Sequence, residues 1–201
     1  MPNPYAFKDE KQEAYDALTF LSAMNTFPDA DLPAAGYTIA WNKHKQLLAS
    51  ANSSNSRSAW ENIGPVNIGG RTISIAIDPT DTAVIWLGSA SGGLWKSSTG
   101  GIGTGSWQFV PTGFPVLGVG AISINPKNHD EIFIGTGETY AYDVSTNGLI
   151  DRTQRGSFGI GILKSMDGGQ NWTTSLDWTY QQNRGVWDIV HNPLNPASLL
   201  A

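Results

Sequence analysis

Cysteine is absent from the sequence, and charged residues are scarce. The 201 residues include no Cys and only 14% Asp, Glu, Lys and Arg, which excludes a disulfide framework and thiolate metal sites. The formal net charge is −5 and no cluster of Lys and Arg is present, so nucleic acid is not an expected partner. No apolar run reaches the roughly 18 residues that a transmembrane helix needs. We therefore predict no membrane span.

Other recognisable site patterns are also missing. The three histidines (His44, His129 and His191) are far apart and make no metal-ligand spacing, so we predict no metal site. Neither a phosphate-binding glycine loop nor a serine nucleophile elbow occurs, and we predict no cofactor. The first residues lack the basic and then apolar stretch of a signal peptide. Either the protein stays inside the cell or a signal has been removed.

The sequence does contain many glycines, prolines and short apolar segments, together with a helical N-terminal part. The chain is 40% hydrophobic with 23 Gly and 11 Pro, a mixture typical of short strands joined by tight turns. Residues 1–50 instead show helical periodicity, with one helix predicted over residues 8–25 and a second after Asp31, with Pro33 in its first turn. A linker rich in Ser and Asn is predicted over residues 51–59. We assign no role to the helical segment beyond packing on the β-rich remainder of the chain.

An alternating pattern of apolar and polar residues begins after residue 60 and then repeats. Asp78 and Asn125 are 47 residues apart, as are Trp60 and Trp107. The second repeat is about 20 residues longer because it contains an insertion, residues 137–158. A four-strand unit of roughly 40–50 residues has the size of one β-propeller blade. The first repeat predicts strands over residues 71–77, 83–89, 93–97 and 107–110.

We therefore predict a mainly β fold of propeller blades in an incomplete ring, preceded by the short helical segment. Two complete four-stranded blades are expected over about 71–110 and 119–175, with a third starting at 186, so that residues 60–201 form a partial propeller. Residues 60–63 match the fourth-strand position and are interpreted as the outer strand of another blade. Propellers have about four to eight blades. The remaining blades of the same parent chain are therefore expected partners.

The stretch "SMDGGQNW" lies between the third and fourth strands of the second blade. Its Asp can accept N–H groups across a hairpin turn, and its two glycines tolerate positive φ. The pattern Ser165-x-Asp167-x-Gly169-x-x-Trp172 resembles the Asp-box, or BNR repeat, of sialidases, sortilin-type receptors and xyloglucanase-like propellers. That resemblance implies a structural turn on the face away from the binding site. The first blade departs from it, with Thr99 in place of the Asp.

The insertion carries the densest set of residues suited to binding. Long loops on a rigid scaffold are where ligand-binding groups tend to lie, and Trp178 and Tyr180 would add flat surface for a sugar. Alternatively, the aromatic residues pack the insertion down and its charges are only solvated. A calcium site would rest on Asp143 and Asp151 alone and is not adopted. The ligand-binding candidates are Glu138, Tyr140, Tyr142, Asp143, Arg152, Arg155 and Trp178.

No catalytic set is evident. The segment "LGSASGGLWK" resembles the xyloglucanase-like motif in which a catalytic Asp precedes Gly-Gly, but Ala90 occupies that place. Sialidase chemistry needs an arginine cluster, and Arg71 alone does not supply one. Glu138, in the equivalent loop of the next blade, stays open as a catalytic acid. We therefore lean towards a chain that is not itself an enzyme.

From Trp60 to the end, the chain resembles the N-terminal part of a sortilin/xyloglucanase-like propeller. The stretch "IGPVNIGGRTISIAIDPTD…IWLGSASGGLWKS" resembles large secreted Bacteroidetes-type proteins that end in a type IX sorting domain. This resemblance implies a secreted or cell-surface protein. The expected function is a scaffold that binds a polysaccharide or protein ligand. The alternatives are a xyloglucanase-like glycoside hydrolase whose catalytic residues lie in missing blades, and a purely structural module.

Overall fold

The structure is a computed structural model. It describes residues 16–17, 20, 23–24, 27–28, 35–51, 70–116, 118–138, 158–181 and 184–201. Its elements are α2 (Gly36–Ala51), β1 (Thr72–Ile77), β2 (Ile85–Ser89), β3 (Leu94–Ser97), β4 (Trp107–Val110), β5 (Val119–Asn125), β6 (Asn128–Thr136), β7 (Gly161–Ser165), β8 (Thr173–Asp177), β9 (Val190–His191) and β10 (Leu199–Leu200). No helix within these ranges is long and apolar enough to cross a membrane.

The N-terminal helices are described only in part. Residues 16, 17, 20, 23 and 24 of the helix predicted over 8–25 are helical, and the rest of it lies outside the described residues. The second predicted helix is α2, which ends one residue inside the predicted linker, at Ala51. Its predicted start at Asp31 and the predicted strand at residues 60–63 also lie outside the described residues.

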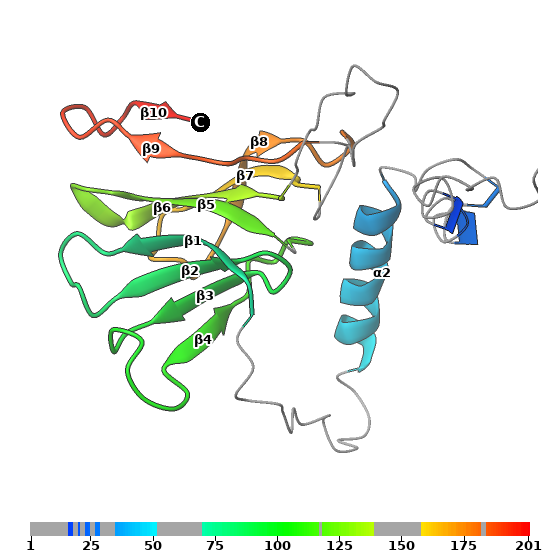
Figure 1. Cartoon of the computed structure of the whole chain (residues 1–201), viewed down its shortest axis with the longest axis horizontal. Helices are drawn as coiled ribbons and strands as arrows, with labels where there is room; N and C mark the ends of the chain where they lie inside the picture. Colours follow the sequence, from blue (N-terminus) through cyan, green and yellow to red (C-terminus); the bar gives the residue numbers. More distant parts are fainter. Residues whose placement is uncertain are drawn as a thin grey trace, which may run out of the picture.

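The strands form two four-stranded antiparallel sheets that stack face to face (Figure 1). In each sheet the strands pair in chain order, β1-β2-β3-β4 in blade 1 and β5-β6-β7-β8 in blade 2. Strands β9 and β10 pair with each other and form a third unit beyond blade 2. This confirms the predicted fold class: a mainly β chain with two complete propeller blades and part of a third.

The repeat is visible in the turns at one end of the blades. Asp78, Asn125 and Asn192 each accept the backbone N–H two residues further on, at 2.8, 2.9 and 2.9 Å. These side chains close the turn that follows the first strand of each unit, as Asn and Asp commonly do. We call this end of the blades, which also carries the β3–β4 and β7–β8 connections, the turn end. The opposite end is the insertion end.

The first seam lies between blade 1 and blade 2. Alternation along the strands directs apolar side chains into it, and its buried members are 0–7% exposed. Trp86 from β2 lies against the blade 2 turn, where a Cβ on Gly169 would be 2.4 Å from the indole atom Cη2. The turn therefore admits the indole only because residue 169 has no side chain. The buried members are Trp86, Leu94, Val119, Ile132, Ile134, Leu163 and Trp172.

The second seam lies between blade 2 and the third unit. Its apolar members are Ala121, Ile162, Val186 and Ile189, but it also contains a histidine. The ring of His191 is 5% exposed, its Nδ1 is 2.7 Å from the hydroxyl of Ser123, and its Nε2 has no partner among the described residues. Burial lowers the pKa of His191 below its ordinary value of 6.5, although Glu131 nearby acts in the opposite direction.

Substituting Gly169 by Ala is expected to destabilise the chain by about 2–4 kcal/mol. Residue 169 has a φ of +88°, which disfavours any side chain, and the new Cβ would collide with Trp86. Gly100 is the matched control, since it has a φ of +66° and no atom lies within 4 Å of the place that a Cβ would take. Urea unfolding should therefore show a smaller loss for Gly100→Ala, of about 1 kcal/mol. Equal losses would mean that the seam tolerates the methyl group.

The second seam is expected to weaken in mild acid. Because the pKa of His191 is lowered in the folded state, the unfolded chain binds the proton first. The stabilisation is complete above about pH 6.5, the pKa of an unfolded histidine, and is lost as the pH falls below it. Urea unfolding at pH 8 and pH 5.5 measures how much unfolding free energy is lost in acid. This loss should be smaller in His191→Ile than in the unmodified chain. Isoleucine is the residue found at the equivalent positions 77 and 124. If the variant lost the same amount of stability, groups other than His191 would be the cause of the pH dependence.

Candidate ligand-binding site

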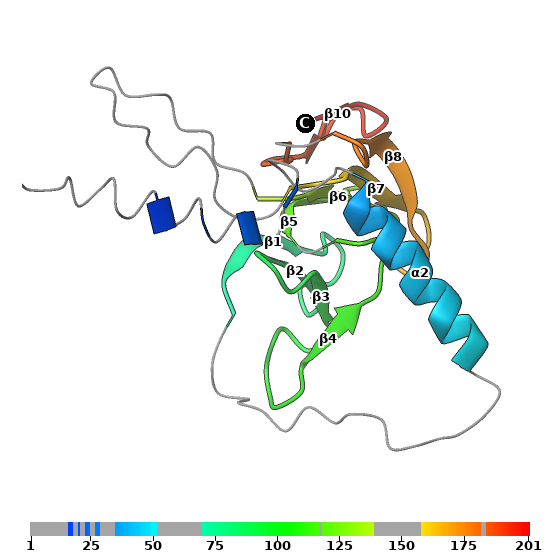
Figure 2. The same ribbon diagram turned by 90° about the vertical axis from the view of Figure 1, so that its right-hand side faces the viewer.

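Helix α2 lies against the insertion end of the blades, as Figures 1 and 2 show. The indole Nε1 of Trp41 donates a hydrogen bond to the carbonyl oxygen of Gly113, 3.2 Å away, in the β4–β5 connection. Residues 42–50 are all exposed, whereas Gly36, Thr38 and Trp41 are partly buried. The first half of α2 is therefore the part that touches the blades.

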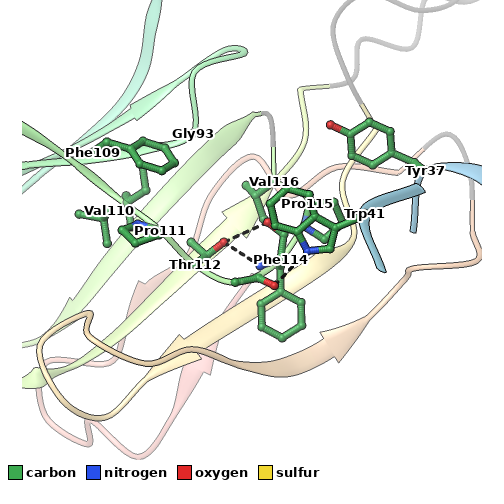
Figure 3. A pocket seen from close by; sticks show the side chains of 12 residues that line it. Tyr37, Trp41, Gly93, Phe109, Val110, Pro111, Thr112, Phe114, Pro115 and Val116 are labelled. Atoms are coloured by element: carbon green, nitrogen blue, oxygen red, sulfur yellow. Dashed lines mark hydrogen bonds between the residues drawn. The ribbon is translucent and has the colours of Figure 1, made fainter. Parts of the chain in front are cut away.

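A pocket of about 220 Å³ opens between α2 and blade 1 (Figure 3). The helix contributes Tyr37 and Trp41, the sheet contributes residues at the ends of β3 and β4, and residues 111–116 close the remaining side. The lining is mostly apolar, with two prolines and four aromatic rings. The lining residues are Tyr37, Trp41, Gly93, Leu94, Phe109, Val110, Pro111, Thr112, Gly113, Phe114, Pro115 and Val116.

The sequence of residues 111–116 fixes the shape of this wall. Pro111 and Pro115 restrict their own φ angles, and Gly113 adopts a φ of +76° that other residues rarely take. The hydroxyl of Thr112 accepts the N–H of Phe114 and donates to its carbonyl oxygen, both at 3.3 Å. The ring of Phe114 is thus held on a short, internally bonded loop. A preformed wall of this kind would not need to be ordered by a ligand.

Glu138 forms a buried ion pair with Arg71. Both carboxylate oxygens accept hydrogen bonds from the guanidinium group, so the contact is bidentate. The Glu138 side chain is 0% exposed, whereas that of Arg71 is 53% exposed. Arg71 directly precedes β1 and Glu138 follows β6, so the pair ties blade 1 to blade 2 at the insertion end. In this structure Glu138 is a residue that holds two blades together.

Trp178 is partly buried and packs against the second seam. The guanidinium carbon of Arg184 lies 5.3 Å from the centre of its ring, in a cation–π contact. Tyr180, two residues further on, is 69% exposed. Of the two aromatic residues expected to stack on a sugar, Tyr180 therefore has the more accessible ring.

Among the described residues, no contact places the other predicted ligand-binding residues at the pocket. Tyr140, Tyr142, Asp143, Arg152 and Arg155 lie outside the described residues, and their ligand role stays a prediction. Ala90, at the place where the xyloglucanase-like motif has its Asp, is 6% exposed. Its N–H donates to the carbonyl oxygen of Arg71, 3.0 Å away, so this loop is closed against the start of β1.

The Ser165–Trp172 stretch is a hydrogen-bonded turn at the turn end, opposite the pocket. The hydroxyl of Ser165 accepts the N–H of Gly169 at 2.9 Å, and Asp167 accepts the N–H of Asn171 at 2.8 Å. The backbone and side-chain N–H groups of Asn171 lower the pKa of Asp167 to about 2. Asp167 therefore serves the turn, and no substrate role is needed to account for it.

The same turn recurs in blade 1 despite the missing carboxylate. Ser97 accepts the N–H of Gly101 at 2.9 Å, as Ser165 does from Gly169. The hydroxyl of Thr99 lies 3.4 Å from that of Ser97 and donates to the carbonyl oxygen of Ile102. The serine and the glycine thus maintain the turn, while the residue between them varies.

The sequence does not predict that a helix forms one wall of the pocket. The sequence places Tyr37 and Trp41 on a helical stripe and residues 111–120 in a loop of the insertion end, but nothing in it joins the two. One signal is present: "PTGFP" places an aromatic residue between prolines, and the aromatic residues of the helix are four apart. Residues 37 and 41 lie on one helix face, and that face needs a partner.

No protein-family model and no curated protein matches the chain. Several solved structures are similar over part of it. An ancestral GH74 enzyme has 24% identity and a TM-score of 0.44, covering 61% of this chain and 15% of its own. A GH74 enzyme from Niastella koreensis has 18% identity and a TM-score of 0.32, covering 70% and 29%. The GH74 xyloglucanase from Xanthomonas campestris has 12% identity and a TM-score of 0.31, covering 65% and 26%. The chain thus spans less than a third of the length of each.

Removing Arg71 is expected to cost about 2–4 kcal/mol of stability, because the buried carboxylate of Glu138 would lose its bidentate partner. The estimate lies towards the low end for buried pairs because Arg71 is half exposed. Urea unfolding of Arg71→Met should show this loss. The double variant Arg71→Met/Glu138→Met should lose less than the sum of the two single variants. Additive losses would mean that the two side chains act independently.

Proposed function

We propose that this chain is the N-terminal part of an exported β-propeller protein that binds a glycan through its insertion end. The observation that carries the proposal is the pocket between α2 and residues 111–116. It is concave and mostly apolar, with aromatic rings from two separate segments, as ligand sites commonly are. The insertion follows β6 of blade 2, whose last residue lies at the same end.

The chemistry of the lining suits a sugar ring better than an ion. One face of a pyranose ring carries mainly C–H groups, which pack on flat aromatic side chains such as Trp41 and Tyr37. Charged side chains are absent from the pocket lining among the described residues. The hydroxyl of Tyr37 and backbone carbonyl groups remain to orient the ligand. Tyr180 and the predicted insertion residues would extend the same surface towards blade 2.

The finer features of the proposal rest on sequence resemblance. We interpret the Ser165–Trp172 turn as an Asp-box, and the pattern of residues 63–97 as that of secreted proteins with a type IX sorting domain. Secretion or display on the cell surface follows from this interpretation. The division into residues 1–50, 51–59 and 60–201 is proposed from the periodicity and composition of the sequence, with further blades of the parent chain completing the ring.

The experiment below also distinguishes two alternative functions. A glycoside hydrolase with its catalytic residues in other blades would bind the same glycan and also cleave it. A protein ligand would use the same end without binding any glycan. The burial of Glu138 against Arg71 disfavours a catalytic acid at residue 138, which supports binding over hydrolysis for this part of the protein.

Trp41→Ala is expected to weaken glycan binding at least about tenfold, since it removes one aromatic wall of the pocket. Isothermal titration of the chain with xyloglucan, β-glucan and sialylated oligosaccharides would measure this. Leu47→Ala, on the same helix and outside the pocket lining, is the matched control and should bind like the unmodified chain. Reducing ends should not increase during incubation.

Three outcomes would contradict the proposal. Release of reducing ends that stops in Glu138→Gln would place a catalytic acid in the insertion. Binding lost in Tyr180→Ala but kept in Trp41→Ala would move the site to blade 2. No binding to any of the glycans, with the chain folded, would favour a protein ligand or a structural module.

A further inference from the structure

Helix α2 is held on the blades by few contacts. Thr38 and Trp41 are partly buried, and every other side chain from Tyr37 to Ser50 is exposed. The hydrogen bond from Trp41 to Gly113 is the only one between α2 and the blades among the described residues. No described strand packs along the helix. The docking of α2 therefore rests mainly on the two side chains that line the pocket, Tyr37 and Trp41.

The sequence of α2 also makes it a weak helix on its own. No acidic residue lies in its first turn and no basic residue lies in its last turn, so the helix dipole is not compensated at either end. Ala35, which precedes the first helical residue, has no side-chain oxygen to cap the free N–H groups. A helix of 16 residues is marginally stable in water even when its residues are favourable. Contacts with the blades must therefore contribute to its helical structure.

The half of α2 that touches the blades contains the poorer helix formers. Residues 36–42 have the sequence GYTIAWN, in which Ala40 is the only strong helix former. Residues 43–51 have the sequence KHKQLLASA, and only His44 and Ser50 are weak helix formers there. The docked half thus depends on its contacts at the pocket rather than on its own helix propensity.

The opposite wall of the pocket is held more firmly. Residues 111–116 follow β4 directly and are shaped by two prolines and by the bonds of Thr112. In addition, the N–H of Val116 donates to the carbonyl oxygen of Phe114, 2.8 Å away. The pocket therefore has one fixed wall and one weakly held wall, the helix (Figure 3).

A ligand in this pocket would touch both walls at once. Tyr37 and Trp41 line one side of it, and Phe114 and Pro115 line the other. A ligand shifts an equilibrium only towards the state to which it binds more tightly. Because the complete pocket exists only when α2 is docked, a bound ligand favours the docked helix.

We propose that α2 is a ligand-ordered wall of the pocket. Without a ligand, the docked helix exchanges with an undocked and partly unfolded state, and a bound glycan shifts this exchange to the docked helix. The inference rests on the proposed function, since the glycan is the ligand that orders α2. Part of the binding energy is used to order the helix, so the affinity depends on how readily α2 forms. Occupancy of the pocket is thereby transmitted to residues 42–50, which lie outside it.

The first test changes the helix propensity of α2 outside the pocket. Asn42 is exposed and does not line the pocket. Alanine is favoured over glycine in a helix by about 1 kcal/mol, which corresponds to about fivefold in an equilibrium constant. Isothermal titration with xyloglucan, β-glucan and sialylated oligosaccharides should therefore give a Kd about fivefold lower for Asn42→Ala than for Asn42→Gly. Equal Kd values would overturn the proposal, since a permanently docked helix would not pass its propensity on to the ligand.

Ser175 supplies the matched control, because it is exposed on β8 and does not line the pocket. Ser175→Ala and Ser175→Gly should bind the glycans with the same Kd. A difference as large as that between the two Asn42 variants would also overturn the proposal, because the affinity would then follow general stability and not the order of α2.

Hydrogen exchange tests the helix directly. In the free chain, the amides of α2 should exchange within about tenfold of the rate of an unstructured peptide, and a saturating glycan should slow them at least about tenfold. If the α2 amides of the free chain exchanged as slowly as those of β6 while a glycan still bound, only the ligand-ordered wall would be contradicted. If none of the three glycans bound, the proposed function itself would be contradicted.

Discussion

The contact between Trp86 and the turn at Gly169 is the interaction on which the described fold depends. An isolated sheet with one solvent-exposed polar face and one apolar face is marginally stable. Each blade therefore needs a neighbour that buries its apolar face. The indole of Trp86 is the largest side chain of the first seam that is fully buried, and the glycine supplies the space for it. The loop that contains Gly169 is shaped by the backbone N–H groups of Gly169 and Asn171, which donate hydrogen bonds to Ser165 and Asp167. A local turn motif thereby determines how closely two sheets approach.

The difference between local and long-range contacts explains which parts of the structure could be predicted from the sequence. The strands follow from alternation with period two, and the turns from Asp or Asn at positions 78, 125 and 192, all of which are local signals. The blade size then follows from their spacing. The contact of Trp41 with Gly113 and the pair of Arg71 with Glu138 join residues 72 and 67 apart, respectively. Nothing in the local pattern specifies such partners, so the helix wall of the pocket and the burial of Glu138 could not be predicted.

The two ends of the blades differ in how their polar groups are used. At the turn end, side chains such as Asp78, Asn125 and Asp167 accept backbone N–H groups of their own tight turns. Groups occupied in this way have little capacity left for a ligand. At the insertion end, proline and internal bonds shape residues 111–116, and aromatic rings are directed into the pocket. These differences between the two ends support the proposed ligand site at the insertion end.

The position of Glu138 bears on catalysis more directly than the pocket does. A general acid must bring a protonated oxygen within hydrogen-bond distance of the bond that it cleaves. Both oxygens of Glu138 instead accept from the Arg71 guanidinium, and its side chain is fully buried. Using Glu138 as an acid would require breaking the pair that joins blades 1 and 2 at this end. A site that needs its scaffold to separate in every turnover is a poor design for catalysis, which argues against Glu138 as the general acid.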